Sequence, residues 1–335
     1  MTRRLISEFA RIVEADGSRF ILAVLPTGPQ IYEDLWSEIL VAAGDDASHF
    51  DPTYPETQLR TFCKADGIRC VTLLDQKRTA VENAPVAEGR FFYDDGRRHF
   101  DNSPNYLRSE LDKSLKRLGL EQIDLFYVHR RDQNCTIEEV TNTLADLVKS
   151  GKIKQFGFSE IAPTSLKLAV DVHPVGAVQS EYSLSTRSPE LGLVQRSRGL
   201  GVSLVAFSPL GRSLLTDNPH SFEKCQLIAF MKDNPRFLEP NYRRNIDATD
   251  RFRTLAREMG HKTASLAISW LLHQGEHILP IPGTRSVSHL EELAIGADIS
   301  LSESDLQAIE KCLPIGWAHG DRYSVAQWVG PEKYC

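Results

Sequence analysis

Several polar side chains of this chain stand just where short apolar runs end, and their types are those from which ligand sites are built. The runs lie between Gln122 and Arg285, and the stretches between them are amphipathic at helical spacing. The polar residues at the run ends are His129, Ser159, Glu160, Gln179, Ser208, Arg212, Thr284 and Arg285. A chain with this set at its predicted strand ends is more typical of an enzyme than of a scaffold.

The segment IPGTRS, residues 281–286, has three features of an anion site at the end of the last predicted strand. Gly283 lets a ligand approach the backbone, Thr284 offers a hydroxyl, and Arg285 carries a positive charge at the start of a predicted helix. Free backbone N–H groups and the helix dipole both favour an anion there. The segment therefore predicts a phosphate site, although a Pro-Gly turn with Arg285 facing solvent accounts for the same residues.

Strands and helices are expected to alternate. Apolar runs predict strands at 19–26, 49–55, 68–76, 122–130, 154–160, 175–183, 202–211 and 277–285. Helical periodicity predicts helices at 31–44, 56–67, 105–119, 136–153, 248–275 (broken at Gly260), 286–297 and 302–313. Parallel strands buried on both faces are continuous apolar runs, and eight of them close a barrel. The sequence therefore predicts an α/β protein with a (β/α)8 TIM barrel that collects the polar run ends on one rim.

We expect one domain, residues 1–335, with long loops at 78–103 and 212–247 and a tail at 314–335. The second loop is far longer than a usual strand-to-helix connection. Its four aromatic residues favour an ordered lid, and they are Phe222, Phe230, Phe237 and Tyr242. The tail has no clear period and is expected to dock on the barrel or to close over a pocket.

Composition excludes several classes of protein. The net charge is −6 at pH 7 and no Lys/Arg run is interleaved with aromatic residues, which argues against a nucleic-acid partner. No apolar stretch is long enough to cross a membrane, and the charged start is unlike a secretory signal, so we expect a cytoplasmic protein. The six cysteines form no C-x-x-C pair, so neither a metal site nor a disulfide framework is indicated.

Six segments resemble successive motifs of the aldo-keto reductases, in order and with natural spacing. They are residues 100–130, 147–160, 177–187, 204–212, 278–292 and 320–324. The nearest resemblance is to the bacterial and fungal branch, which is similar to the potassium-channel beta subunits. The resemblance implies a (β/α)8 barrel that binds NADPH (NADP+) without a Rossmann fold, in keeping with the lack of a G-x-G-x-x-G motif after any predicted strand.

The resemblance also implies roles for individual residues. His129 matches the active-site histidine, which orients a carbonyl oxygen. Ser159 and Gln179 match positions that hydrogen-bond the nicotinamide carboxamide, and Phe207 matches the aromatic residue that stacks on its ring. The segment that wraps the pyrophosphate is matched by Ser208, Leu210 and Arg212. The phosphate and adenosine end is matched by Gly283, Thr284, Arg285, His289 and Glu292, with Leu293 where the family usually has Asn.

The family's catalytic Asp, Tyr and Lys are matched by Asp51, Tyr54 and Lys77, at altered spacing. Asp51 and Tyr54 are three residues apart instead of five, and alignment puts Gln76 at the lysine position. The pKa of a tyrosine is about 10, so proton donation at neutral pH requires a nearby cation such as Lys77. Two interpretations of Tyr54 are open: a proton donor, or a turn residue between two prolines.

The leading hypothesis is an NADPH-dependent oxidoreductase that interconverts a carbonyl and an alcohol. An alternative is a cofactor-binding barrel with lost or altered reductase activity that acts as a regulatory or redox-sensing partner. A third hypothesis is a lyase or isomerase that holds a phosphorylated substrate at IPGTRS. The expected partner is a small-molecule carbonyl or alcohol, with neither nucleic acid nor membrane, and a homo-oligomer is compatible with the sequence.

Overall fold

The computed structural model describes residues 21–24, 61, 64–65, 67, 69–72, 99–284 and 286–333. The chain divides into two compact units, Met1–Arg90 and Phe91–Cys335. Each unit is described by itself, so the expectation of a single domain stays a prediction. The predicted helix at 31–44 and strand at 49–55 lie outside the described residues.

The first unit contains a pair of parallel strands. Strand β1 (Ile21–Val24) pairs with β2 (Arg69–Thr72), with Ile21 opposite Arg69 and Val24 opposite Thr72. The strands predicted at 19–26 and 68–76 are therefore present over shorter spans.

The second unit is built on a five-stranded parallel sheet in which the strands follow chain order, β3-β4-β5-β6-β7. The strands are β3 (Ile123–Val128), β4 (Ile153–Ser159), β5 (Ala177–Glu181), β6 (Ser203–Phe207) and β7 (Ile278–Ile281). All five were predicted from apolar runs. Because neighbouring strands are parallel, their carboxyl ends lie at the same edge of the sheet.

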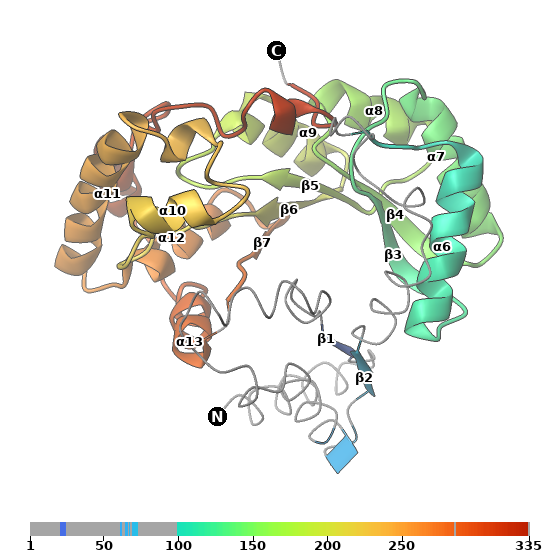
Figure 1. Ribbon diagram of the computed structural model, residues 1–335, viewed down its shortest axis with the longest axis horizontal. Helices are drawn as coiled ribbons and strands as arrows, with labels where there is room; N and C mark the ends of the chain where they lie inside the picture. Colours follow the sequence, from blue (N-terminus) through green and yellow to red (C-terminus); the bar gives the residue numbers. More distant parts are fainter. Residues whose placement is uncertain are drawn as a thin grey trace. The chain divides into compact units, whose positions relative to one another are not determined.

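Helices connect these strands, and in Figure 1 α6 to α9 lie along the outer side of the curved sheet. The helices are α6 (Pro104–Leu118), α7 (Ile137–Lys149), α8 (Pro163–Val172), α9 (Leu193–Gly199), α10 (Phe222–Leu227), α11 (Asn241–Glu258), α12 (Thr263–Leu272), α13 (Val287–Ile295) and α14 (Glu303–Cys312), with 3-10 turns η2 (Ser188–Leu191), η3 (Pro235–Phe237) and η4 (Ala326–Trp328). This order confirms the predicted alternation over the described part of the chain.

Local sequence explains why α7 begins and which face it buries. The Thr136 hydroxyl accepts a hydrogen bond from the Glu139 N–H at 3.2 Å, and the Glu139 carboxylate accepts one from the Thr136 N–H at 2.9 Å. This reciprocal cap stabilises the first turn by about 0.5–2 kcal/mol. Val140, Leu144 and Leu147 then recur at helical spacing and are all buried against the sheet.

The start of α11 differs from its prediction. The helix begins at Asn241, whereas periodicity predicted a start at 248, so the preceding connection is shorter than the predicted loop at 212–247. The extra turns are anchored by polar contacts: the Asn245 amide donates to the Arg236 and His319 carbonyls at 3.0 and 2.9 Å. A search for apolar periodicity misses such a start because hydrogen bonds from distant residues hold it. The connection contains α10 and η3, and its role as a lid stays a prediction.

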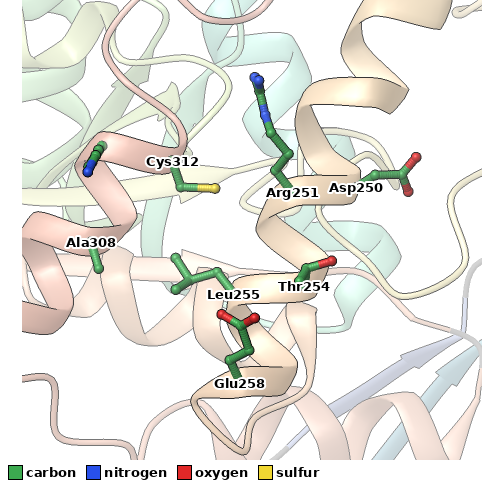
Figure 2. Close-up of a pocket in the computed structure, with 8 residues that line it drawn as sticks. Asp250, Arg251, Thr254, Leu255, Glu258, Ala308 and Cys312 are labelled. Carbon is green, nitrogen blue, oxygen red and sulfur yellow. The ribbon is translucent and has the colours of Figure 1, made fainter.

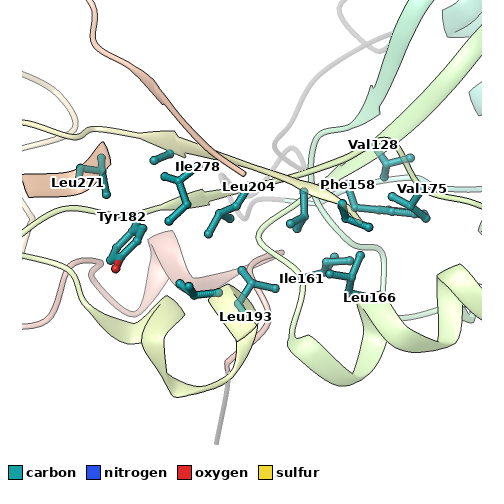
Figure 3. Packing of buried hydrophobic residues seen from close by; sticks show 14 of the residues in the cluster. Val128, Phe158, Ile161, Leu166, Val175, Tyr182, Leu193, Leu204, Leu271 and Ile278 are labelled. Carbon is teal, nitrogen blue, oxygen red and sulfur yellow. The ribbon is translucent and has the colours of Figure 1, made fainter. Parts of the chain in front are cut away.

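The core lies between the outer face of the sheet and the helices. Phe158 and Val178 from neighbouring strands belong to one buried cluster with Leu166 of α8 and Leu193 of α9. Figure 3 shows Phe158, Leu166 and Leu193 in this cluster. Each of these side chains is completely buried. Burial of one such side chain contributes about 1.5–3 kcal/mol. This packing determines which face of the sheet remains for the polar residues.

Gly157 in β4 creates room for an aromatic ring on the opposite face. A Cβ at this position would lie 2.6 Å from the Tyr127 ring and 2.7 Å from the Ala177 carbonyl oxygen. The Tyr127 ring therefore lies directly over the glycine, which a larger residue would prevent.

Substitution of Gly157 by alanine is expected to lower the free energy of unfolding by about 1–3 kcal/mol, because the backbone carbonyl of Ala177 cannot move aside. Urea denaturation would measure the change. The matched control is Gly199→Ala in helix α9, where a Cβ meets nothing within 4 Å and should add about 0.4–1 kcal/mol. Equal unfolding free energies for Gly157→Ala and the unsubstituted protein would contradict the close approach.

Candidate active site

Four of the predicted site residues lie on one face of the sheet at its carboxyl edge. Phe158 and Val178 are buried under the helices, and side chains alternate along a strand, so Ser159 and Gln179 belong to the other face. Ser159 stands opposite Gln179 in the register. The same alternation, counted from core residues Val128 and Ala206, puts His129 and Phe207 on that face. Four strands thus contribute His129, Ser159, Gln179 and Phe207 to one surface.

Arg130 links two of these residues. Its Nη1 donates to the Ser159 hydroxyl at 2.9 Å and to the His129 carbonyl at 2.6 Å. Its Nε is buried and has no hydrogen-bond partner among the described residues. The Phe100 ring lies edge-on to the His129 imidazole, with centroids 6.2 Å apart. Sequence reasoning assigned His129 and missed Arg130, although the pair stands together at the end of the strand.

Gln179 has a partner on the inner face. Its side chain hydrogen-bonds the Tyr127 hydroxyl; burial raises the pKa of Tyr127, and this hydrogen bond offsets part of the rise. The Tyr127 phenol therefore remains neutral near pH 7 and can orient the Gln179 carboxamide.

The backbone after β6 turns sharply through residues 208–213. Ser208, Gly211, Arg212 and Ser213 have φ angles of 50°, 56°, 55° and 82°. Positive φ is uncommon outside glycine, and within this turn the Gly211 N–H donates to the Ser208 carbonyl at 2.9 Å. Leu210, predicted to contact the cofactor, packs partly against the core. The strained turn brings Arg212 back toward the strand ends.

Arg212 belongs to a buried cluster of charges centred on Glu181. The Glu181 carboxylate accepts a hydrogen bond from Arg212 at 2.7 Å and lies 3.7 Å from Arg322 and 3.9 Å from Arg236. Burial lowers the pKa of Arg236, and the charges of Arg322 and Arg212 lower it further, against the opposing effect of Glu181. Arg322 also forms an ion pair with the Glu160 carboxylate.

The cluster of five charges has one positive charge in excess: Arg212, Arg236 and Arg322 against Glu160 and Glu181. A buried excess of positive charge favours a bound anion. The cluster therefore fits the diphosphate of a dinucleotide. The long-range partners of Glu160 and Glu181 could not be found from spacing along the chain.

The C-terminal segment, residues 317–333, docks on the strand ends. The Trp317 indole donates to the Leu184 carbonyl at 2.7 Å, and the Glu332 carboxylate accepts from the Ala162 N–H at 2.7 Å. Tyr323 is buried, with its ring edge-on to Phe230 at 5.9 Å. Of the two roles expected for the tail, these contacts correspond to docking.

The predicted phosphate and adenosine end is more exposed. Gly283 and Thr284 are exposed, and the Thr284 hydroxyl accepts from the Ser286 N–H at 3.2 Å at the start of α13. Arg285 lies outside the described residues.

Two further predicted residues follow on α13. The His289 side chain is exposed. Burial raises the pKa of the Glu292 carboxyl, and the negative charge of Asp217 raises it further. Leu293, which replaces the family's usual Asn, is buried in a small cluster with Ala264 and Ile268. Its side chain stabilises the helix packing.

The predicted catalytic residues Asp51, Tyr54 and Lys77 lie outside the described residues, so their assignment stays a prediction. Among the side chains that are described, no group of three or more His, Cys, Asp or Glu residues could hold a metal ion. None of the described helices is long and apolar enough to cross a membrane.

A groove lies away from the strand ends, between α11 and α14 (Figure 2). It is lined by Asp250, Arg251, Thr254, Leu255, Glu258, Ala308, Lys311 and Cys312. None of the predicted site residues lines it. The Cys312 thiol is free, and burial raises its pKa, so the thiolate form is disfavoured.

Comparison with known protein families gives one match over most of the chain. The profile of the Aldo/keto reductase family matches residues 45–314. Among curated proteins, the chain is 40% identical over 223 residues to a probable aldo-keto reductase of Glycine max. It is 35% identical over 231 residues to the aldo-keto reductase yakc [NADP(+)] of Schizosaccharomyces pombe. These alignments cover 67% and 68% of this chain and 64% and 68% of the relatives, so the chain spans about two-thirds of their length.

Solved structures give the same fold. The glycerol dehydrogenase of Gluconobacter oxydans superposes with a TM-score of 0.57 and 27% identity, over 64% of this chain and 65% of that one. A thermostable aldo-keto reductase has a TM-score of 0.50 and 24% identity, over 62% and 66%. The predicted (β/α)8 barrel is thereby confirmed as the fold class.

The buried Tyr323 predicts a stability change at high pH. Burial, and then the charges of Glu160 and Glu181, raise the pKa of Tyr323 from 10 to about 12. The folded protein therefore holds the neutral phenol while the unfolded chain ionises, so this contribution is complete below pH 10 and is lost as the pH rises toward 12.

The difference in unfolding free energy between the unsubstituted protein and Tyr323→Phe should fall by about 2–3 kcal/mol between pH 9 and 12. Denaturant titrations of both proteins across that range would measure it. The phenylalanine variant is its own control because it cannot ionise. A difference that does not change with pH would contradict the prediction.

Proposed function

This chain belongs to the aldo/keto reductase family, and on that premise we propose that it is an NADPH-dependent oxidoreductase that interconverts a carbonyl and an alcohol. The observation that carries the proposal is the common face shared by His129, Ser159, Gln179 and Phe207 at the carboxyl edge of the sheet. In barrels of parallel strands, catalytic residues lie at this edge. A cytoplasmic location and the lack of a nucleic-acid partner stay predictions.

The residues present suit a dinucleotide in two respects. Arg212, in the turn after β6, and the excess positive charge beside Glu181 match a diphosphate. The buried Nε of Arg130 offers a donor next to Ser159, whose hydroxyl already accepts from the same guanidinium. The Ser159 hydroxyl proton thus remains available to a carboxamide oxygen.

Each residue has a separate part in the proposed reaction. Ser159 and Gln179 would hold the nicotinamide carboxamide through hydrogen bonds, and Phe207 would offer a flat ring for stacking. When bound and reduced, this group would supply the hydride for the carbonyl carbon. His129 donates a hydrogen bond to the carbonyl oxygen, and Tyr54 gives that oxygen its proton. The Lys77 ammonium lowers the pKa of the phenol, and Asp51 holds Lys77 in place. Alcohol oxidation uses the same groups in reverse.

Arg285 supports the choice of NADPH over NADH. A guanidinium pairs with a phosphate through two parallel hydrogen bonds, and only NADPH carries a 2′-phosphate. The relative from Schizosaccharomyces pombe has NADP(+) in its name.

The purified protein is expected to quench NADPH fluorescence on titration and to bind NADH at least about tenfold more weakly, a difference of about 1.4 kcal/mol. Arg285→Met should bring the NADPH affinity close to that of NADH, because the variant lacks the phosphate partner. Arg117→Met, at an exposed position of the outer helix α6, is the control. A protein that binds neither dinucleotide would refute the proposed function.

The second test is turnover. With NADPH and a panel of aldehydes, His129→Asn and Tyr54→Phe should each lower kcat by about 10²–10⁴-fold, since each removes hydrogen-bond or proton help at the carbonyl oxygen. Their dissociation constants for NADPH should stay within a few-fold of the unsubstituted protein. Tight NADPH binding without any turnover of the panel would favour the regulatory alternative, and full activity of Tyr54→Phe would identify it as a turn residue.

A further inference from the structure

Glu160, the residue directly after β4, has an unusual conformation and almost no exposure. Its φ angle is 58° and its residue exposure is 1%. A non-glycine residue in the left-handed region persists only where its surroundings hold it there. The contacts of Glu160 should therefore explain why this conformation is retained.

The backbone of Glu160 connects two segments that are distant in the chain. Its N–H donates to the Gln179 carbonyl of β5 at 2.8 Å, and its carbonyl accepts from the Glu332 N–H of the C-terminal segment at 2.8 Å. The same residue thus touches the end of the neighbouring strand and the tail.

The side chain makes the same two connections. One carboxylate oxygen accepts from the Glu181 N–H at 2.8 Å and from the Ser180 hydroxyl at 3.2 Å. The other accepts from the Arg322 guanidinium of the C-terminal segment. Both oxygens are therefore satisfied, one by β5 and one by the tail.

The Glu160–Arg322 ion pair is buried on both sides. The side chains are 0% and 6% exposed, and the guanidinium lies against the Tyr323 and Trp328 rings at 4.5 and 4.8 Å. Burial opposes the charge on Arg322, but Glu160 raises the pKa of Arg322 above its usual range, so the charge is retained. Among the described residues, removal of the Glu160 charge leaves Arg322 only the more distant Glu181 carboxylate, at 3.7 Å, and removal of Arg322 leaves the buried Glu160 carboxylate without its ion pair.

A second ion pair holds the end of the C-terminal segment, and here the segment carries the negative partner. Arg131, after β3, pairs with Glu332 of the segment at 3.1 Å. Between the two pairs, the backbone of Gly330 runs close to the site: a Cβ there would lie 2.4 Å from the Phe100 ring and 2.9 Å from the Arg130 Cβ. The segment therefore packs against Arg130, the partner of the Ser159 hydroxyl.

We propose that Glu160 is a positioning residue, whose ion pair with Arg322 fixes the C-terminal segment against Arg130 and thereby sets Ser159 and Gln179 for the nicotinamide end of the dinucleotide. This inference rests on the proposed function. The contacts of the pair lie at the carboxyl ends of β4 and β5 and reach the Glu181 cluster, whereas the adenosine end of the site is predicted after β7 and on α13.

The test compares two ligands on one set of variants. NADPH reaches both ends of the proposed site, whereas adenosine 2′-monophosphate lacks the diphosphate and reaches only the adenosine end. Glu160→Gln keeps the size of the side chain and an acceptor for the Glu181 N–H, but it removes the charge opposite Arg322. It should weaken NADPH binding by about tenfold or more and leave the affinity for adenosine 2′-monophosphate unchanged.

Arg322→Gln breaks the pair from the tail and should have the same effect, which keeps the test valid if Glu160→Gln does not fold. The double variant should bind NADPH no worse than the single variants, because both act through one interaction. Asp112→Asn, which breaks the exposed Lys152–Asp112 pair at 2.6 Å, is the control and should change neither affinity.

The outcomes separate the two proposals. An unsubstituted protein that binds neither ligand refutes the proposed function. If it binds both, then unchanged NADPH affinity in Glu160→Gln and Arg322→Gln overturns the positioning role, and so does an equal loss of both ligands, which would indicate a general loss of structure. Additive losses in the double variant would also overturn the coupling through the pair.

Discussion

The alternation of side chains in a sheet covered by helices is the constraint on which the site depends. Phe156 and Phe158 are fully buried in the core, and this commits Gly157 and Ser159 to the opposite face. A shift of β4 by one residue would put two phenylalanines on the inner face and a serine hydroxyl in the core. The hydrophobic packing of the outer face thus fixes the direction of the polar residues on the inner face.

Several buried charged side chains lie together at the carboxyl edge of the sheet, and each would destabilise the fold if it had no partner of opposite charge. Glu160, Glu181 and Arg322 are almost completely buried, and an isolated ion in such a place would lose several kcal/mol of hydration. The Glu160 carboxylate accepts from Arg322, the Glu181 N–H and the Ser180 hydroxyl, and the Glu181 carboxylate accepts from Arg212 and the Thr186 hydroxyl. A network of this kind leaves little freedom of position, and it joins the strand ends to the C-terminal segment.

Prediction from sequence succeeded where the cause is local. The capping box at Thr136 and the terminating Gly119, with φ 61°, set the bounds of α7 and α6 within a few residues. The start of α11 was predicted too late, because Asn245 is held by carbonyls from distant segments. Arg130 and Arg322 were not assigned for the same reason: their partners lie 29 and 162 residues away.

The sequence by itself determined the order of strands and helices, the barrel class and the presence of His129 and Ser159 at strand ends, because hydrophobic period and turn chemistry act over a few neighbouring residues. Only the tertiary structure decided which charges meet. The excess positive charge around Glu181 and the ion pair between Glu160 and Arg322 of the C-terminal segment join residues that are far apart in the chain. Packing brings these segments together, and the spacing of residues along the chain does not encode their proximity.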